Sequence, residues 1–165
     1  PAIIVMNHAS ALDIVLMEII VKSYPHIWLT KQEYTKIPLF SVLLKRMHVP
    51  VKRENHMHAA RAMIKAINRA KTISSHILIF PEGTRHADGK IHNFQSGFAL
   101  IAKKLNRPVI PIKTTGLHEI FPKGKILINY RATEPTATIG KPIYIEPNET
   151  AESFAERVKN WFFES

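Results

Sequence analysis

Short runs of β-branched and other apolar residues alternate along this chain with segments whose apolar residues recur at helical spacing. The runs expected to form strands are Ile3–Met6, His26–Thr30, Val49–Val51, Ile77–Phe80, Val109–Lys113, Ile126–Arg131 and Thr136–Ile139. The helical patterns begin near Ser10, Pro38, Asn55, Phe94 and Thr150. This alternation predicts an α/β fold, in which helices flank a mixed, largely parallel sheet.

The length of 165 residues predicts a single domain over residues 1–165, and no linker, repeat or low-complexity block divides it. No apolar run approaches the roughly 20 residues of a membrane span. The nearest run, Ile14–Val21, is short and contains Glu18. The chain opens on Pro1 and enters a strand-like run at once, which is typical of a trimmed sequence, so an upstream anchor stays open.

The chain is strongly basic, with 23 Lys and Arg against 13 Asp and Glu and a net charge of +10. Such a surface favours nucleic acid, anionic lipid or phosphorylated small molecules. The positive charge is concentrated from Lys22 to Lys71. No helix-turn-helix spacing, aromatic strand or Cys/His finger accompanies it, so no nucleic-acid partner is expected. The absence of cysteine excludes thiol catalysis, disulfides and thiolate metal sites.

The helix predicted after Asn55 has an apolar face and a basic face. Its apolar face is expected to consist of Met57, Ala60, Met63, Ile64, Ile67 and Ala70. Its basic residues recur four apart, at Arg61, Lys65 and Arg69. Two interpretations stay open: a core-packed helix with a solvated basic face, or a helix that contacts anionic lipid.

The segment from Asn7 to Asp13 lies between a predicted strand and a predicted helix. His8 and Asp13 are five residues apart, so they meet only if His8 lies in the turn before the helix and Asp13 in its first turn. The carboxylate would then hold one imidazole nitrogen and leave the other as a general base. The alternative is a capping box, with Ser10 as N-cap and Asp13 at the third helical position.

The segment Phe80–Arg85 follows another predicted strand, where open α/β sheets bind ligands. Gly83 lets a ligand approach the backbone closely, and Arg85 offers a planar fork for a phosphate. An ordinary turn with an exposed arginine would have the same sequence. Arg53 and Lys31 also follow predicted strands and are weaker candidates for the same role.

In this order, the segments resemble the glycerolipid acyltransferase family. The matching blocks are Asn7-His8-x-Ser10-x-x-Asp13, Arg53, Phe80-Pro81-Glu82-Gly83-Thr84-Arg85 and Val109-Ile110-Pro111-Ile112. The resemblance implies that family's fold and the transfer of a fatty acyl group from acyl-CoA or acyl-carrier protein to a lysophospholipid hydroxyl. The expected acceptor is 1-acyl-glycerol-3-phosphate and the expected product is phosphatidic acid, as in phospholipid biosynthesis.

The resemblance also implies residue roles. His8 would be the general base that deprotonates the acceptor hydroxyl, and Asp13 would orient it. The acceptor phosphate would be bound by Arg53, Glu82, Gly83, Thr84, Arg85 and Lys31. No metal, cofactor or acyl-enzyme is implied beyond the acyl thioester as co-substrate. The domain would work against an anionic membrane surface, on the cytoplasmic face, peripherally or through an anchor absent from this chain.

Two departures from the family pattern leave the acceptor open. Pro50 and Lys52 stand where an aromatic residue and an Asp are usual, and Phe94–Gly97 lacks a frequent Lys. Another acceptor, such as glycerol-3-phosphate or a different lysolipid, therefore stays open. So does a module that binds anionic lipid without catalysis, although the intact His8 and Asp13 argue against it.

Overall fold

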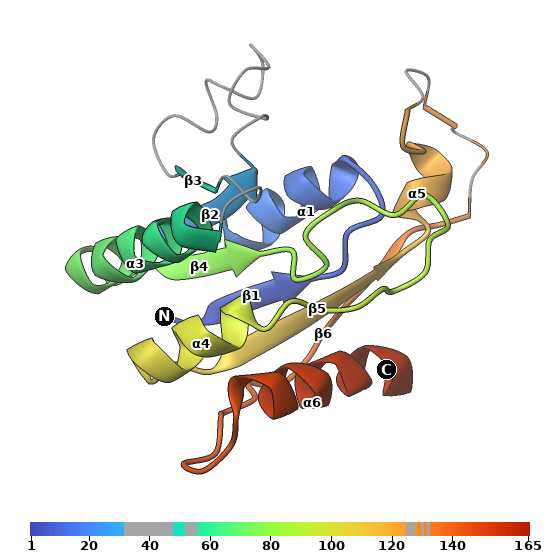
Figure 1. Cartoon of the computed structure of the whole chain (residues 1–165). Helices are drawn as coiled ribbons and strands as arrows, with labels where there is room; N and C mark the ends of the chain where they lie inside the picture. The colour runs from blue at the N-terminus through green and yellow to red at the C-terminus, as the bar shows by residue number, and fades with distance from the viewer. Residues whose placement is uncertain (32–47, 52–55, 125–127, 130, 132) are drawn as a thin grey trace.

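The computed structural model describes residues 1–31, 48–51, 56–124, 128–129, 131 and 133–165. Its sheet has six strands in the order β3-β2-β4-β1-β5-β6 (Figure 1). The strands are β1 (Ile3–Met6), β2 (His26–Lys31), β3 (His48–Val51), β4 (His76–Ile79), β5 (Val109–Thr115) and β6 (Thr136–Ile139). All neighbouring strands are parallel except β5 and β6. The predicted α/β fold with a mixed, largely parallel sheet is therefore confirmed.

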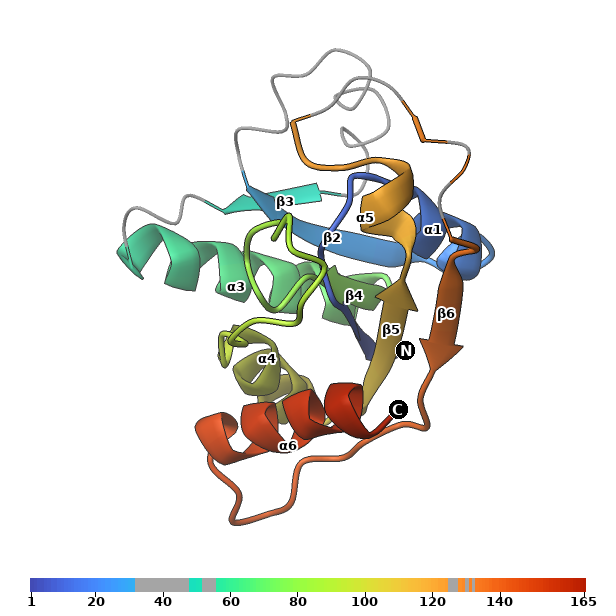
Figure 2. The same cartoon turned by 90° about the vertical axis from the view of Figure 1, so that its right-hand side faces the viewer.

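Helices cover both faces of the sheet. They are α1 (Leu12–Val21), α3 (His56–Thr72), α4 (Gly97–Leu105), α5 (Leu117–Ile120) and α6 (Ala151–Glu164). Helices α3, α4 and α6 lie on one face and α1 lies on the other (Figures 1 and 2). The hydroxyl oxygen of Thr150 accepts a hydrogen bond from the Ser153 N–H at 3.1 Å, which caps α6 where the sequence predicts its start.

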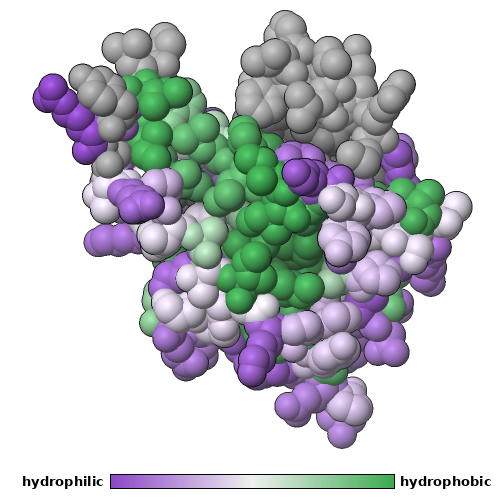
Figure 3. Space-filling model, turned by 180° about the vertical axis from the view of Figure 1, so that it is seen from behind, coloured by the Kyte–Doolittle hydropathy of each residue, from purple (hydrophilic) through white to green (hydrophobic). Residues whose placement is uncertain are grey.

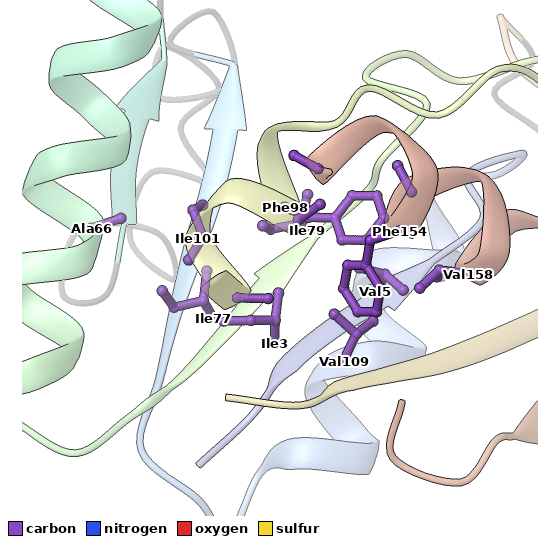
Figure 4. Close-up of a cluster of buried hydrophobic side chains, with 14 of the residues drawn as sticks. Ile3, Val5, Ala66, Ile77, Ile79, Phe98, Ile101, Val109, Phe154 and Val158 are labelled. Atoms are coloured by element: carbon purple, nitrogen blue, oxygen red, sulfur yellow. The ribbon is translucent and has the colours of Figure 1, made fainter. Parts of the chain in front are cut away.

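The larger hydrophobic core fills the space between the sheet and the three helices on its first face. Figure 4 shows Phe98, Phe154 and Val158 from these helices facing the strand residues Val5 and Val109. Phe98 and Phe154 are almost fully buried. This packing makes the sheet a rigid support for the loops at its edges.

The inner face of α3 differs from the prediction. Its buried residues are Ala62, Ala66 and Ala70, whereas Met57 and Ile64 are 62% and 57% exposed. Small alanine side chains let the helix backbone approach the strands closely, which turns the larger Ile64 towards solvent. The predicted apolar face is therefore wrong for Met57, Ala60 and Ile64, and correct for the others.

The second face of the sheet is covered by α1, which packs Met17 and Val21 against Trp28 and its neighbours. Val15 and Ile19 on α1 are exposed, and the space-filling view shows an apolar area on this side (Figure 3). Helix α1 is apolar but only 10 residues long. In the described ranges, no helix combines the length and the apolar character that crossing a membrane requires.

Other element predictions need correction. The helix predicted near Phe94 begins at Gly97, and α5 is too short to show a periodic pattern. The strand predicted over 126–131 is not formed at its described residues, Ile128, Asn129 and Arg131. The Asn129 N–H instead donates to the Ile120 carbonyl at 2.7 Å, which takes it out of strand pairing. The helix predicted near Pro38 lies outside the described residues.

Candidate active site

The two strongest sequence motifs meet at the carboxyl edge of the sheet. Strands β1 and β4 are parallel neighbours, so the segments that follow them leave the sheet side by side. Asn7 and His8 follow β1, and Phe80–Arg85 follows β4. Figure 2 looks onto this edge, where the loop after β4 (yellow-green) lies beside α5. The carboxyl edge is where open α/β sheets bind ligands.

His8 and Asp13 form a buried pair. His8 lies in the turn before α1, and Asp13 is the second residue of that helix. The His8 Nδ1 lies 3.0 Å from the Asp13 Oδ2, and the two residues are 6% and 0% exposed. The geometry predicted for this pair is therefore present. A carboxylate accepts hydrogen bonds, so this contact favours the tautomer with the proton on Nδ1, in which the lone pair of the neutral ring lies on Nε2, as a general base requires.

The Asp13 carboxylate also shapes the start of α1. Its Oδ2 accepts hydrogen bonds from the backbone N–H groups of Ala9 and Ser10, both at 2.8 Å. The bond to Ser10 is one half of the predicted capping box. The other half is not formed, because the Ser10 oxygen accepts a hydrogen bond from the Leu12 N–H at 3.3 Å in place of the Asp13 N–H, and the N-cap residue is Ala11. The Ser10 hydroxyl also donates to the Phe121 carbonyl at 2.9 Å. One carboxylate therefore both holds the turn before the helix and orients His8.

The His8 ring is also held by stacking. Its centroid lies 3.8 Å from that of Phe80, and the two ring planes differ by 10°. Phe80 is the first residue after β4, so its position is set by the sheet. Stacking and the Asp13 hydrogen bond together restrict the ring to one orientation, which is what a residue that transfers a proton requires.

Glu82 supports His8 through the backbone. Its Oε1 accepts a hydrogen bond from the His8 N–H at 2.8 Å, and its Oε2 accepts one from the His92 N–H at 3.0 Å. Burial raises the pKa of Glu82, and the two N–H donors oppose that shift. The same loop holds the other side of His8, since the His86 N–H donates to the His8 carbonyl at 3.1 Å. Glu82 thus positions the His8 backbone, and contact with a phosphate stays a prediction.

The remaining predicted phosphate contacts lie in or near this loop. Gly83 has a φ of +78°, a left-handed conformation that favours glycine, and its N–H donates to the Phe80 carbonyl. Thr84 is exposed and Arg85 is half-buried. The Arg85 carbonyl accepts a hydrogen bond from the Lys123 Nζ at 3.0 Å, which ties the loop to the segment after α5.

Two weaker candidates cannot be placed. Lys31 is the last residue of β2, but its side chain lies outside the described part of the chain. All of Arg53 lies outside it as well. Their roles in binding phosphate stay predictions.

Asn7 and Thr114 have a part in the site that the motif did not reveal. The Asn7 side chain donates to the Thr114 carbonyl at 2.9 Å and accepts from the Thr114 N–H at 2.7 Å. The Thr114 hydroxyl lies 3.4 Å from the Asp13 Oδ1, the oxygen that faces away from His8. Strand β5 therefore braces the carboxylate. These residues lie 107 positions apart, and the parallel pairing of β1 with β5 in the folded sheet brings them together, so the local motif gave no signal of the contact.

His86 and His92 lie beside Glu82. Their rings stack at 3.5 Å, His92 is hydrogen-bonded to Asp88, and the His86 Nε2 lies 4.0 Å from the Glu82 Oε2. Burial and the neighbouring His92 lower the pKa of His86. Among the residues that the structure describes, no group of three or more His, Asp or Glu side chains is arranged to hold a metal ion.

Comparisons with known proteins identify the family of this chain. Residues 1–115 match the family profile described as Acyltransferase. The chain is similar to a chloroplastic 1-acyl-sn-glycerol-3-phosphate acyltransferase of Brassica napus, with 31% identity over 100% of this chain and 46% of the relative. It is 34% identical to a 1-acyl-sn-glycerol-3-phosphate acyltransferase of Cocos nucifera over 77% of this chain and 41% of that relative.

A solved structure has the same fold. The crystal structure of the 1-acyl-sn-glycerophosphate acyltransferase of Thermotoga maritima matches with a TM-score of 0.75 and 27% identity. The match covers 99% of this chain and 64% of that one. The chain thus spans less than half of these two curated relatives and less than two thirds of the solved structure.

Proposed function

This chain belongs to the acyltransferase family, and from that premise and its His8–Asp13 pair we propose that it transfers a fatty acyl group to 1-acyl-glycerol-3-phosphate. The donor is an acyl thioester, acyl-CoA or acyl-carrier protein, and no further cofactor takes part. The observation that carries the proposal is the buried 3.0 Å hydrogen bond between His8 and Asp13 at the carboxyl edge of the sheet. The relatives' names support the choice of acceptor.

In the proposed reaction, the Nε2 of His8 takes the proton of the acceptor hydroxyl as its oxygen attacks the thioester carbonyl carbon. A tetrahedral intermediate forms, the carbon–sulfur bond breaks, and the imidazolium returns the proton to the leaving thiolate. Asp13 stabilises the imidazolium throughout. The products are an ester and a free thiol, so atoms and charge balance.

The acceptor phosphate is proposed to bind at the loop after β4. Arg85 and Arg53 supply guanidinium groups, each able to pair with two phosphate oxygens. The Gly83 backbone, the Thr84 hydroxyl and the Lys31 ammonium complete the proposed set. Basic side chains at the carboxyl edge are proposed to hold the domain against anionic lipid, on the cytoplasmic face of a membrane.

The test is thiol release from a long-chain acyl-CoA, with and without 1-acyl-glycerol-3-phosphate, for the wild type and His8→Gln. Loss of a general base lowers the rate about 100- to 10,000-fold. His76→Gln is a matched control, since His76 begins β4 at the opposite edge of the sheet. Full activity is expected in this control.

Other results would redirect the assignment. Release that does not need an acceptor would indicate a thioesterase. Release that occurs with glycerol-3-phosphate and not with 1-acyl-glycerol-3-phosphate would indicate the same reaction on a different acceptor. No release with acyl-CoA or acyl-carrier protein and any lysolipid, together with binding to anionic vesicles, would indicate a non-catalytic lipid-binding module.

A further inference from the structure

The outer surface of α3 carries positive charge that the fold does not use. Arg61 and Lys65 are exposed, and no carboxylate within the described ranges lies at ion-pair distance from either. No acidic residue occurs between His56 and Pro81. Basic residues in the last turn of a helix interact favourably with the helix dipole, but Arg61 and Lys65 lie earlier in α3. Because they are four positions apart on the helix, their positive charges repel each other.

An apolar side chain lies within this charged surface. Ile64 is 57% exposed and is next to Lys65. The last turn of α3 adds the exposed Lys71. A surface that carries one sign of charge complements a partner of the opposite charge. We call Arg61, Ile64, Lys65 and Lys71 the α3 surface.

The α3 surface lies close to the candidate active site. Helix α3 connects the parallel strands β3 and β4, so it runs against the strand direction and begins at their carboxyl edge. The side chain of Met63 packs against Gly97, at 3.4 Å from the position a Cβ would occupy. Shortly before Gly97, the Gln95 N–H donates to the Pro81 carbonyl. The first half of α3 therefore lies beside the start of α4, which directly follows the loop that holds His8.

We propose that the α3 surface docks an acidic carrier protein, which delivers the acyl group to His8 as a thioester. This proposal rests on the proposed function and identifies the kind of donor. A partner docked on α3 extends along the side of the domain and reaches the carboxyl edge, where its thioester meets the acceptor. Negative charge on the carrier speeds its association by electrostatic steering.

The direction of α3 distinguishes this partner from a membrane. Its axis follows the strands, so its surface runs along the side of the domain (Figure 1). A flat lipid surface laid on the carboxyl edge would meet only the first turn of α3. The apolar area around α1 lies on the opposite side of the sheet (Figure 3). Lipid and carrier protein therefore have separate approaches.

The test measures binding of a labelled long-chain acyl-carrier protein by fluorescence anisotropy. The variant is R61E/K65E, and its matched control is K22E/K141E, which makes the same charge change at exposed positions away from α3. We expect the affinity of R61E/K65E to fall about tenfold or more, because like charges then face each other. The control keeps the wild-type affinity, and circular dichroism verifies that both variants fold.

Kinetics give the second measurement. In R61E/K65E, kcat/KM is expected to fall for acyl-carrier protein and to stay near the wild-type value for acyl-CoA of the same chain length. Equal binding by the variant and the control overturns the proposal, as does an equal loss with both donors or a loss confined to anionic vesicles. Binding needs no turnover, so failure of acyl transfer would refute the proposed function and leave the docking result standing.

Discussion

Replacing Asp13 by asparagine separates the charge of the carboxylate from the hydrogen bonds that it accepts. The Oδ2 accepts from the His8 ring at 3.0 Å and from the N–H groups of Ala9 and Ser10 at 2.8 Å. An amide oxygen in the same place keeps all three bonds. The new NH₂ group then faces the Thr114 hydroxyl, whose oxygen can accept. We therefore expect Asp13→Asn to fold with the His8 ring in its native orientation.

The missing charge then determines the effect on the rate. When His8 takes the acceptor proton it becomes an imidazolium, and a carboxylate about 4 Å from it contributes about 4 kcal/mol at an effective dielectric constant of about 20. Each factor of ten in rate corresponds to about 1.36 kcal/mol. We expect kcat to fall by up to about a thousandfold. The KM for the acceptor should stay unchanged, because Asp13 is fully buried.

Asp13→Ala is the control that removes the hydrogen bonds as well. It leaves three buried donors without an acceptor, at a cost of about 1–3 kcal/mol each. Each kcal/mol of lost stability lowers the Tm of a domain of this size by about 2–4 °C. The Tm of Asp13→Ala should therefore fall by roughly 10 °C or more, which is a larger decrease than that expected for Asp13→Asn. Thermal unfolding and the thiol-release assay measure both quantities. The reasoning fails if Asp13→Asn keeps its kcat within about threefold, or if it unfolds as early as Asp13→Ala.

Three further predictions follow from the contacts. Glu82→Gln leaves one of two buried N–H groups without an acceptor, so the free energy of unfolding should fall by about 1–3 kcal/mol. The kcat should fall as well, with the KM for the acceptor unchanged. A change confined to KM would instead indicate that Glu82 contacts the phosphate. Arg107 donates hydrogen bonds to the Ser75 and Ala70 carbonyls, so Arg107→Lys should lower the free energy of unfolding by about 1–3 kcal/mol. The folded variant should keep its activity. An unchanged Tm would contradict this prediction. The hydrogen bond that His26 donates to Glu18 raises the pKa of His26 above 6.5. The stabilisation from this pair is therefore complete below pH 6.5 and is lost as the pH rises through the raised pKa. The Tm difference between the wild type and Glu18→Gln should therefore shrink above pH 6.5, and a constant difference would argue against the pair.

Local sequence was sufficient for most of the described strands and for the His8–Asp13 pair. The alternation of strand and helix patterns predicted the parallel sheet, and the motifs predicted the family to which the chain belongs. His8 and Asp13 are only five residues apart, so one turn and the start of one helix decide whether they meet. Thr150 likewise predicted the start of α6, because a capping hydroxyl acts on the adjacent turn.

The supports of that pair depend on contacts between distant segments. Glu82 reaches the His8 N–H from 74 residues away, and Thr114 reaches Asn7 from 107 residues away. The Ser10 oxygen accepts from the nearby Leu12 N–H, but its hydroxyl also donates to the Phe121 carbonyl, which only the folded chain brings near. Ile64 shares the helical spacing of core residues, yet the alanines of α3 face the sheet. Spacing identifies which residues share a face, whereas strand order and competition among buried partners decide where that face points.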